Sequence, residues 1–236
     1  MEGFDELWPG GPRFRQGGFR LSTDSVLLAC FAAKIPARRI MDLGCGAGVL
    51  TVLLSASHPD SEVRGIEIQE QSAEICRANM AENGYGAENI ICGDMRRYRE
   101  ELRAGEYDLV VSNPPYFPVG SGGTAPDDAR ACARDERCCT LDDVCRAAAY
   151  LCRWGGSFAM VHRPERLSEI FCTLHGAGLE PKRLRMVQYA AGSAPNLVLV
   201  ESRRGGRPGL AVEPPLLLTE NGKDSEEVIQ IYHREG

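Results

Sequence analysis

From Arg39 onward, strand-like and helix-like segments alternate along the chain with few interruptions. Short apolar runs of strand length are followed by longer segments whose apolar residues recur at helical spacing. Such alternation is typical of βαβ units, so it predicts a doubly wound α/β sheet with helices on both faces. The predicted strands are Arg39–Leu43, Glu62–Ile68, Asn89–Cys92, Tyr107–Ser112, Gly156–His162, Arg183–Tyr189 and Asn196–Ser202, and the predicted helices are Val49–Ser57, Gln69–Asn83, Leu141–Trp154 and Arg163–Gly176.

The length of 236 residues suits one large domain with extensions. We expect an N-terminal extension over residues 1–35, a core domain over residues 36–202 and a C-terminal tail over residues 203–236. Residues 117–139 have little periodicity and follow a predicted strand directly, and long loops of this kind are usually functional or disordered. In the tail, the apolar run Val228–Tyr232 is a candidate for one further strand.

The composition argues against several classes of protein. No apolar run approaches the ~20 residues that a membrane helix needs, and the acidic N-terminus lacks the apolar region of a secretory signal, so we expect a cytoplasmic protein. None of the ten cysteines stands in a C-x-x-C spacing, so we expect no metal site and read most thiols as small buried hydrophobes. For the cluster Cys132, Cys138 and Cys139 a redox or metal role stays open.

A glycine-rich turn, Asp42–Gly48, follows the first predicted strand and precedes the first predicted helix. Its residues Gly44, Gly46 and Gly48 allow a sharp turn and a close approach of the backbone to a ligand. Ligands of open parallel sheets bind beyond the carboxyl ends of the strands. The turn therefore predicts a nucleotide-like cofactor at this edge of the sheet.

Three carboxylates at strand ends distinguish between possible cofactors. Asp42, Glu67 and Asp94 end three successive predicted strands, and Met95 follows the last of them. Asp42 would repel a pyrophosphate but suits a cationic amino acid group, Glu67 can accept from both ribose hydroxyls, and Asp94 can accept from an adenine amino group. The set favours S-adenosylmethionine as the cofactor, with NAD as the weaker alternative.

The fourth predicted strand ends in Asn113-Pro114-Pro115-Tyr116. Tandem prolines force a rigid extended turn and leave carbonyl acceptors without donors. The Asn113 side-chain oxygen and the Pro114 carbonyl can then hold both hydrogens of one planar amino group and aim its lone pair at a methyl group. Alignment and stabilisation of the positive charge that develops on nitrogen would supply most of the rate. Tyr116 can stack on the target base.

The distribution of charge bears on the substrate. The formal net charge is −6, yet residues 153–207 carry nine Arg or Lys against four acids, and residues 13–39 carry six against one. Such asymmetry permits a basic face on an acidic protein, although an ordinary solvated surface explains it equally well. If the following basic residues share one face near the site, we expect them to contact RNA phosphates: Arg163, Arg166, Lys182, Arg183, Arg203 and Arg204.

Together these motifs resemble the class I methyltransferases that carry an Asn-Pro-Pro-Tyr motif, and among them the bacterial enzymes that methylate adenine N6 beside the anticodon of valine tRNA. The resemblance covers about residues 14–202 and rests on Arg20–Leu28, Asp42–Gly48, Asn113–Phe117 and Val161–Leu167, with a weaker match at Ala133–Glu136. It implies a Rossmann-like seven-stranded sheet whose last strand is antiparallel. It also implies that Thr23 and Asp24 close the cofactor pocket, which the N-terminal extension would cover.

Alternatives to this interpretation stay open. A protein glutamine-N5 or a guanine-N2 methyltransferase needs the same pair of acceptors for a planar amino group, so the motif cannot separate them from an adenine-N6 enzyme. The basic segments favour RNA, and in particular tRNA, as the partner. A non-catalytic cofactor-binding subunit is a third possibility, but such a subunit has no need of an intact Asn113–Tyr116 motif. His162–Arg166 can equally be a plain helix start with an intrahelical ion pair, and the oligomeric state is not determined.

Overall fold

The computed structural model describes residues 4–15, 22–116 and 139–233. Phe117, Cys132, Cys138, and the Ala133–Glu136 stretch lie outside these ranges, as do Arg20 and Leu21. Within the described ranges, none of the helices is both long and apolar enough to cross a membrane.

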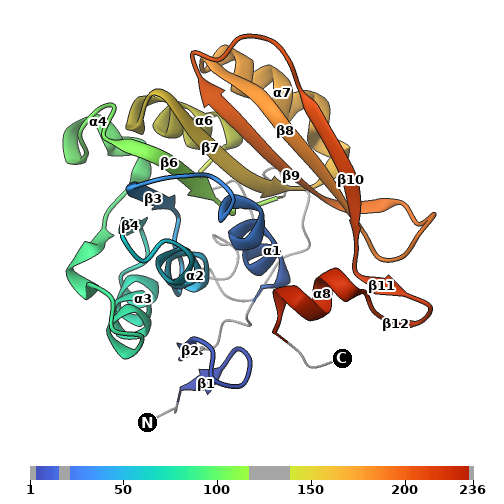
Figure 1. Cartoon of the computed structure of the whole chain (residues 1–236). Coiled ribbons are helices and arrows are strands. Elements are labelled where there is room, and N and C mark those ends of the chain that lie inside the picture. Colours follow the sequence, from blue (N-terminus) through green and yellow to red (C-terminus); the bar gives the residue numbers. More distant parts are fainter. Residues whose placement is uncertain (1–3, 16–21, 117–138, 234–236) are drawn as a thin grey trace, which may run out of the picture.

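One large sheet runs through the molecule (Figure 1) in the order β10-β8-β9-β7-β6-β3-β4-β5. Strand β9 is antiparallel to both of its neighbours, β7 and β8. The predicted doubly wound sheet with an antiparallel last strand is therefore confirmed. The strands are β3 (Arg39–Leu43), β4 (Glu62–Glu67), β5 (Ile90–Cys92), β6 (Tyr107–Ser112), β7 (Cys152–His162), β8 (Leu179–Gln188), β9 (Pro195–Arg204) and β10 (Ala211–Leu217).

Helices cover both faces of the sheet because its central strands are apolar on both sides. Ile40 of β3 packs with α1, α2 and α8, whereas the next residue, Met41, packs with α6 and α7 on the other face. Helix α3 packs beside α2, and the short N-terminal strands β1 and β2 dock on α3. The bounds are α1 (Thr23–Ala32), α2 (Val49–Ser57), α3 (Glu70–Glu82), α4 (Tyr98–Glu101), α6 (Leu141–Leu151), α7 (Leu167–Gly176), α8 (Glu226–Ile231), β1 (Asp5–Glu6) and β2 (Arg13–Phe14).

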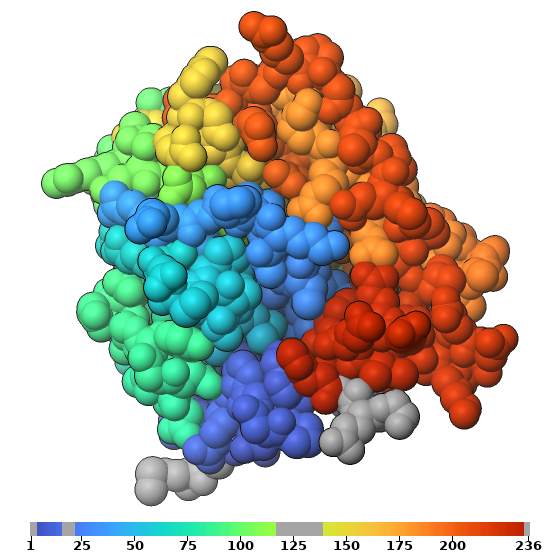
Figure 2. Space-filling model, viewed as in Figure 1, coloured from blue at the N-terminus to red at the C-terminus, as the bar shows by residue number. Residues whose placement is uncertain are grey.

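The C-terminal tail differs from expectation. Within it, β10 pairs in parallel with β8 and extends the predicted seven-stranded sheet to eight strands among the described residues. Two further short strands, β11 (Thr219–Glu220) and β12 (Lys223–Asp224), form a separate antiparallel pair. The predicted strand Val228–Tyr232 is wrong, because Ser225 caps a helix there by accepting a hydrogen bond from Val228 N at 3.2 Å. That helix, α8, packs against α1, and Figure 2 shows the red C-terminal segment meeting the blue N-terminal part of the chain.

Two helix boundaries also differ. The helix predicted over Arg163–Gly176 begins as α7 at Leu167, after a 3-10 turn over Pro164–Arg166. The helix predicted over Leu141–Trp154 ends at Leu151, and Cys152 already belongs to β7. Two glycines follow at Gly155 and Gly156, and Gly155 adopts a positive φ of 78°. The register between β6 and β7 shifts in this region, so sheet pairing continues where the helical spacing suggested one more turn.

Candidate active site

The strand register brings the predicted residues to one edge of the sheet. Asp42 of β3 pairs with Gly65 of β4 and with Val111 of β6, and Glu67 of β4 pairs with Cys92 of β5. These strands are parallel, so the segments that follow their carboxyl ends emerge side by side. Asp42, Glu67, Asp94 and Asn113 therefore surround one region, as the sequence predicted.

The glycine-rich turn has the geometry that requires glycine. Gly44, Gly46 and Gly48 adopt φ values of 74°, 54° and 88°. A Cβ on Gly48 would lie 2.5 Å from Cys76 Sγ, whereas a Cβ on Gly46 would meet nothing within 4 Å. Gly48 is thus needed for packing against α3, and Gly46 borders open space that a ligand can use.

Asp42 is buried, with 1% of its surface exposed. Thr51 Oγ1 of α2 donates a 2.7 Å hydrogen bond to Asp42 Oδ2, which ties the helix to the strand before the turn. Burial raises the pKa of Asp42 to about 7, with the charge of Glu67 adding to the rise and the Thr51 hydrogen bond opposing it. Burial therefore favours the neutral form of this carboxyl group in the ligand-free protein.

Glu67 holds the glycine-rich turn from the neighbouring strand. Its Oε2 accepts from Gly46 N at 3.0 Å, and its Oε1 accepts from Gln69 N at 2.9 Å. Burial raises the pKa of Glu67, and the backbone hydrogen bonds oppose that rise. A carboxylate has about four acceptor positions, and the backbone groups of Gly46, Ile68 and Gln69 use three of them, so acceptor capacity remains for a ligand hydroxyl.

Asp94 is engaged by a residue that the sequence reasoning missed. Arg96 Nη2 donates to Asp94 Oδ2 at 2.6 Å, and Arg96 Nε lies 2.9 Å from both carboxylate oxygens. This hydrogen-bonded guanidinium lowers the pKa of Asp94. Met95 lies beside the turn, with its Cε 3.2 Å from where a Cβ on Gly44 would stand. Ile68, which follows Glu67 in the sequence, has a large apolar side chain that is 45% exposed.

The Asn-Pro-Pro-Tyr turn is held by the first turn of α1. Ser25 Oγ accepts from Asn113 Nδ2 at 2.9 Å, and the Asn113 Oδ1 atom lies 2.7 Å from the Tyr116 hydroxyl. The same hydroxyl lies 2.7 Å from Asp24 Oδ2. Asp24 therefore meets the predicted methyl-acceptor motif, while Thr23, at the start of the helix, is exposed.

The comparisons with known proteins agree with this geometry. The sequence profile of the methyltransferase small domain matches residues 20–124. The tRNA1(Val) (adenine(37)-N6)-methyltransferase of Porphyromonas gingivalis is 34% identical, over 78% of this chain and 74% of its own length. This chain belongs to that methyltransferase family. A relative of the same name from Tolumonas auensis is 29% identical, over 85% of this chain and 82% of its own length.

A solved structure supports the fold of the methyltransferase. It is described as a predicted O-methyltransferase from Agrobacterium tumefaciens, and it matches with a TM-score of 0.72 at 23% identity. The match covers 91% of this chain and 98% of that one. At this identity the likeness shows the shared arrangement of strands and helices alone.

In the methyltransferase, the stretch after β7 braces the Asn-Pro-Pro-Tyr turn. Arg166 Nη1 donates to the Tyr116 carbonyl at 3.2 Å and Arg163 lies 5.2 Å from the Tyr116 ring centroid. The His162 ring lies 5.3 Å from the same ring, and burial lowers the pKa of His162 to about 4. Arg166, at the N-cap of α7, also pairs with Glu169 of that helix at 2.6 Å. The stretch therefore starts a helix and also contacts the Asn-Pro-Pro-Tyr turn through Arg166.

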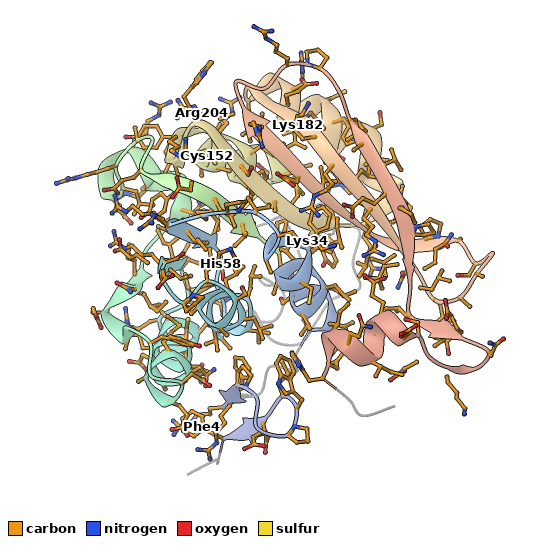
Figure 3. All side chains as sticks on the ribbon, in the orientation of Figure 1. Phe4, Lys34, His58, Cys152, Lys182 and Arg204 are labelled. Atoms are coloured by element: carbon orange, nitrogen blue, oxygen red, sulfur yellow. The ribbon has the colours of Figure 1, made fainter. Side chains whose placement is uncertain are left out.

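The predicted single basic face near the site is wrong for several of its residues. Arg204 Nη1 donates to the Cys152 carbonyl at the start of β7, and in Figure 3 Arg204, Lys182 and Cys152 lie toward the same end of the sheet. This is the amino end of the parallel strands, because β9 runs antiparallel and β8 begins there. Arg183 is bound to Glu201 at 2.8 Å within the sheet. Only Arg163 and Arg166 of the six lie beside the candidate site.

Sequence reasoning missed the residues that hold the predicted ones in place. Thr51, Arg96 and Ser25 each bond directly to a predicted site residue. Ser25 follows Asp24 in the stretch Arg20–Leu28 on which the family resemblance rests, and this neighbourhood is the signal in the sequence that could have identified it as a site residue. No group of three or more His, Cys, Asp or Glu side chains in the described part of the chain could hold a metal ion.

Proposed function

We propose that this methyltransferase moves a methyl group from S-adenosylmethionine to the exocyclic N6 of an adenine in RNA, most specifically an adenine near the anticodon of a tRNA. The observation that carries the proposal is the orientation of Asn113, whose amide nitrogen donates to Ser25 and whose oxygen is thereby kept as an acceptor beside the Tyr116 hydroxyl. The relatives named tRNA1(Val) (adenine(37)-N6)-methyltransferase supply the substrate class.

The residues present fit S-adenosylmethionine. Glu67 has acceptor capacity left for a ribose hydroxyl, and Gly46 leaves open space beside it. The exposed Ile68 offers an apolar surface for an adenine ring, and Asp94 can accept from its amino group once Arg96 gives up part of its contact. Asp42 lies beneath the turn, and a cationic amino acid moiety bound there would favour its ionised form against the effect of burial.

The bound cofactor would supply an electrophilic methyl group on a sulfonium. The protein's part is to orient the acceptor, because an aryl amine has its lone pair delocalised into the ring. Asn113 Oδ1 and the Pro114 carbonyl hold the two amine hydrogens and direct the lone pair out of the ring plane. Preorganised acceptors of this kind stabilise the positive charge that develops on nitrogen. Tyr116 would stack on the base while its hydroxyl keeps its contact with Asp24.

The N-terminal extension is proposed as a cover for the cofactor pocket. Asn79 of α3 connects the two, since its Oδ1 accepts from Arg15 N at 2.7 Å and its Nδ2 donates to Ala47 O at 2.7 Å. Phe14 is buried in the same cluster as Cys45 of the turn. The hydrogen bonds of Asn79 therefore couple the position of the extension to that of the glycine-rich turn.

Product analysis tests this proposal. The protein is incubated with radiolabelled S-adenosylmethionine and either total tRNA or total cell protein, and the products are digested to nucleosides or amino acids. We expect label in N6-methyladenosine from tRNA. Label in N2-methylguanosine or in N5-methylglutamine would instead establish one of the alternatives, and the absence of label in every fraction would support a non-catalytic subunit.

A further inference from the structure

Three side-chain oxygen atoms, one from α1 and two from the Asn-Pro-Pro-Tyr turn, lie in a row beside the proposed acceptor site. Asp24 Oδ2 and Asn113 Oδ1 each lie 2.7 Å from the Tyr116 hydroxyl oxygen. An ionised carboxylate and an amide oxygen only accept hydrogen bonds, so the two contacts share the single hydroxyl hydrogen. The cluster therefore has room for one more proton, either on Asp24 or from an amine that enters the site.

The orientation of the Asn113 amide decides whether an amine can enter. The opposite orientation would place an NH2 group against the Tyr116 hydroxyl and remove the acceptor that an amine needs. Ser25 Oγ, which is 9% exposed, receives Asn113 Nδ2 and supports the amine-binding orientation. In that state, the amine hydrogen that Asn113 Oδ1 holds lies beside the Tyr116 hydroxyl, which can take it as it donates its own hydrogen to Asp24.

Tyr116 is suited to relay a proton rather than to keep a negative charge. Burial, with the nearby Asp24 charge as the next cause, raises the pKa of Tyr116 well above its usual range. A phenolate is therefore disfavoured, and Tyr116 must gain a hydrogen as it gives one away. Among the described residues, the charged and titratable groups around it are Asp24 from α1, His162 at the end of β7, and Arg163 and Arg166 after β7.

We propose that Asp24 is the acceptor for the proton that the amine releases on methylation, with the Tyr116 hydroxyl as the relay. The proposal rests on the proposed function, because it needs an amino group held by Asn113. It assigns Asp24 to the methyl-acceptor side of the site, where the family resemblance assigned it to closure of the cofactor pocket.

The step balances in atoms and charge. The amine lone pair forms the N–CH3 bond, and the S–CH3 bond breaks with its electron pair left on sulfur. The nitrogen passes one proton to Tyr116 Oη while the Tyr116 hydroxyl proton moves to Asp24 Oδ2. The sulfonium cation and the Asp24 carboxylate anion are thus neutralised in one event, so no uncompensated charge is left in the site.

The test compares substitutions of Asp24 in single-turnover methylation of tRNA at saturating cofactor. Asp24→Asn keeps an oxygen that accepts from Tyr116 but cannot take a proton, so methyl transfer should slow by about 100-fold, the lower end of the range for general-base catalysis. The dissociation constant for S-adenosylmethionine, measured by calorimetry, should stay at the wild-type value. Asp60→Asn, at an exposed turn, is the matched control and should turn over normally.

Chemical rescue separates a proton acceptor from a structural role. Asp24→Ala opens space for a small carboxylate, so added formate should restore part of its rate, and chloride at the same ionic strength should not. Three results would each overturn the proposal. Asp24→Asn could be fully active, its main defect could be weaker cofactor binding, or formate could fail to restore the rate of Asp24→Ala. In those cases, the wild-type enzyme still methylates tRNA, so the proposed function stands. A wild-type enzyme that leaves tRNA unmethylated overturns both.

Discussion

Replacing Asp42 by asparagine should stabilise the ligand-free protein at alkaline pH. The carboxyl group is 1% exposed, and its only hydrogen-bond donor that we find in the described residues is Thr51, which can donate equally well to an asparagine oxygen. Burial raises the pKa of Asp42, so folding opposes its ionisation. The unfolded chain ionises freely, and ionisation therefore favours the unfolded state.

The size and the pH range of this effect follow from the pKa. In the folded protein the pKa rises from 3.8 to about 7, and such a difference corresponds to about 4 kcal/mol at pH 8. This destabilisation of the folded protein by ionised Asp42 is nearly absent below the pKa of Asp42 in the unfolded chain. It grows between pH 4 and 7 and is constant above the pKa of Asp42 in the folded protein. At pH 4.5 it should be about 1 kcal/mol by the same relation.

Urea unfolding at pH 4.5 and pH 8 measures the free energy of unfolding of the ligand-free wild type and of Asp42→Asn. We expect the variant to be more stable, with a gap that widens toward pH 8, and to bind S-adenosylmethionine more weakly because a counter-charge is lost. Asp60→Asn is the exposed control and should show no widening gap. A variant that is no more stable than the wild type at pH 8, or a gap that does not change with pH, would refute the reasoning.

Four further outcomes are expected. Asn113→Ala should bind the cofactor normally and lose methyl transfer by ~10²-fold or more in single-turnover assays; near-normal turnover would remove Asn113 from the acceptor site. Glu67→Ala should weaken S-adenosylmethionine binding by ~1.5–3 kcal/mol in calorimetry, and unchanged affinity would contradict its role. Ser25→Ala should lower kcat about tenfold without changing the KM for RNA, while Ser25→Thr keeps the hydroxyl and the rate; equal rates for the two variants would exclude amide positioning. Arg163→Glu should reduce the slope of log affinity for RNA against log salt by about 0.7, whereas Arg203→Glu, at the far end of the sheet, should not, and the reverse result would show that RNA binds at that end.

Short-range patterns were enough to predict most of the fold. Apolar runs and glycines mark where each strand ends, because backbone conformation and burial on both faces act within a few residues. The predictions failed where local signals competed. Val228–Tyr232 is apolar enough for a strand, yet the cap at Ser225 and the acidic first turn make it a helix, and the sheet takes Ala211–Leu217 as its outer strand.

The same limit explains the basic residues. Their positions along the chain show an excess of positive charge, but not which ends of the strands they occupy or which acids they meet. The antiparallel course of β9 carries Arg203 and Arg204 away from the site, and Arg183 is neutralised by Glu201 on the neighbouring strand. Strand direction is a property of the whole sheet, so charge counts alone overestimated the basic surface near the site.

The sequence by itself determined which groups end the strands: the glycine-rich turn, the carboxylates Asp42, Glu67 and Asp94, and the Asn-Pro-Pro-Tyr motif. Only the tertiary structure decided what those groups contact. Ser25 and Asp24 lie 88 and 92 residues from their partners Asn113 and Tyr116, so no local pattern joins them. Hydrogen bonds of this kind, and the burial that shifts the pKa of Asp42, arise only when packing brings separate elements together and removes water from between them.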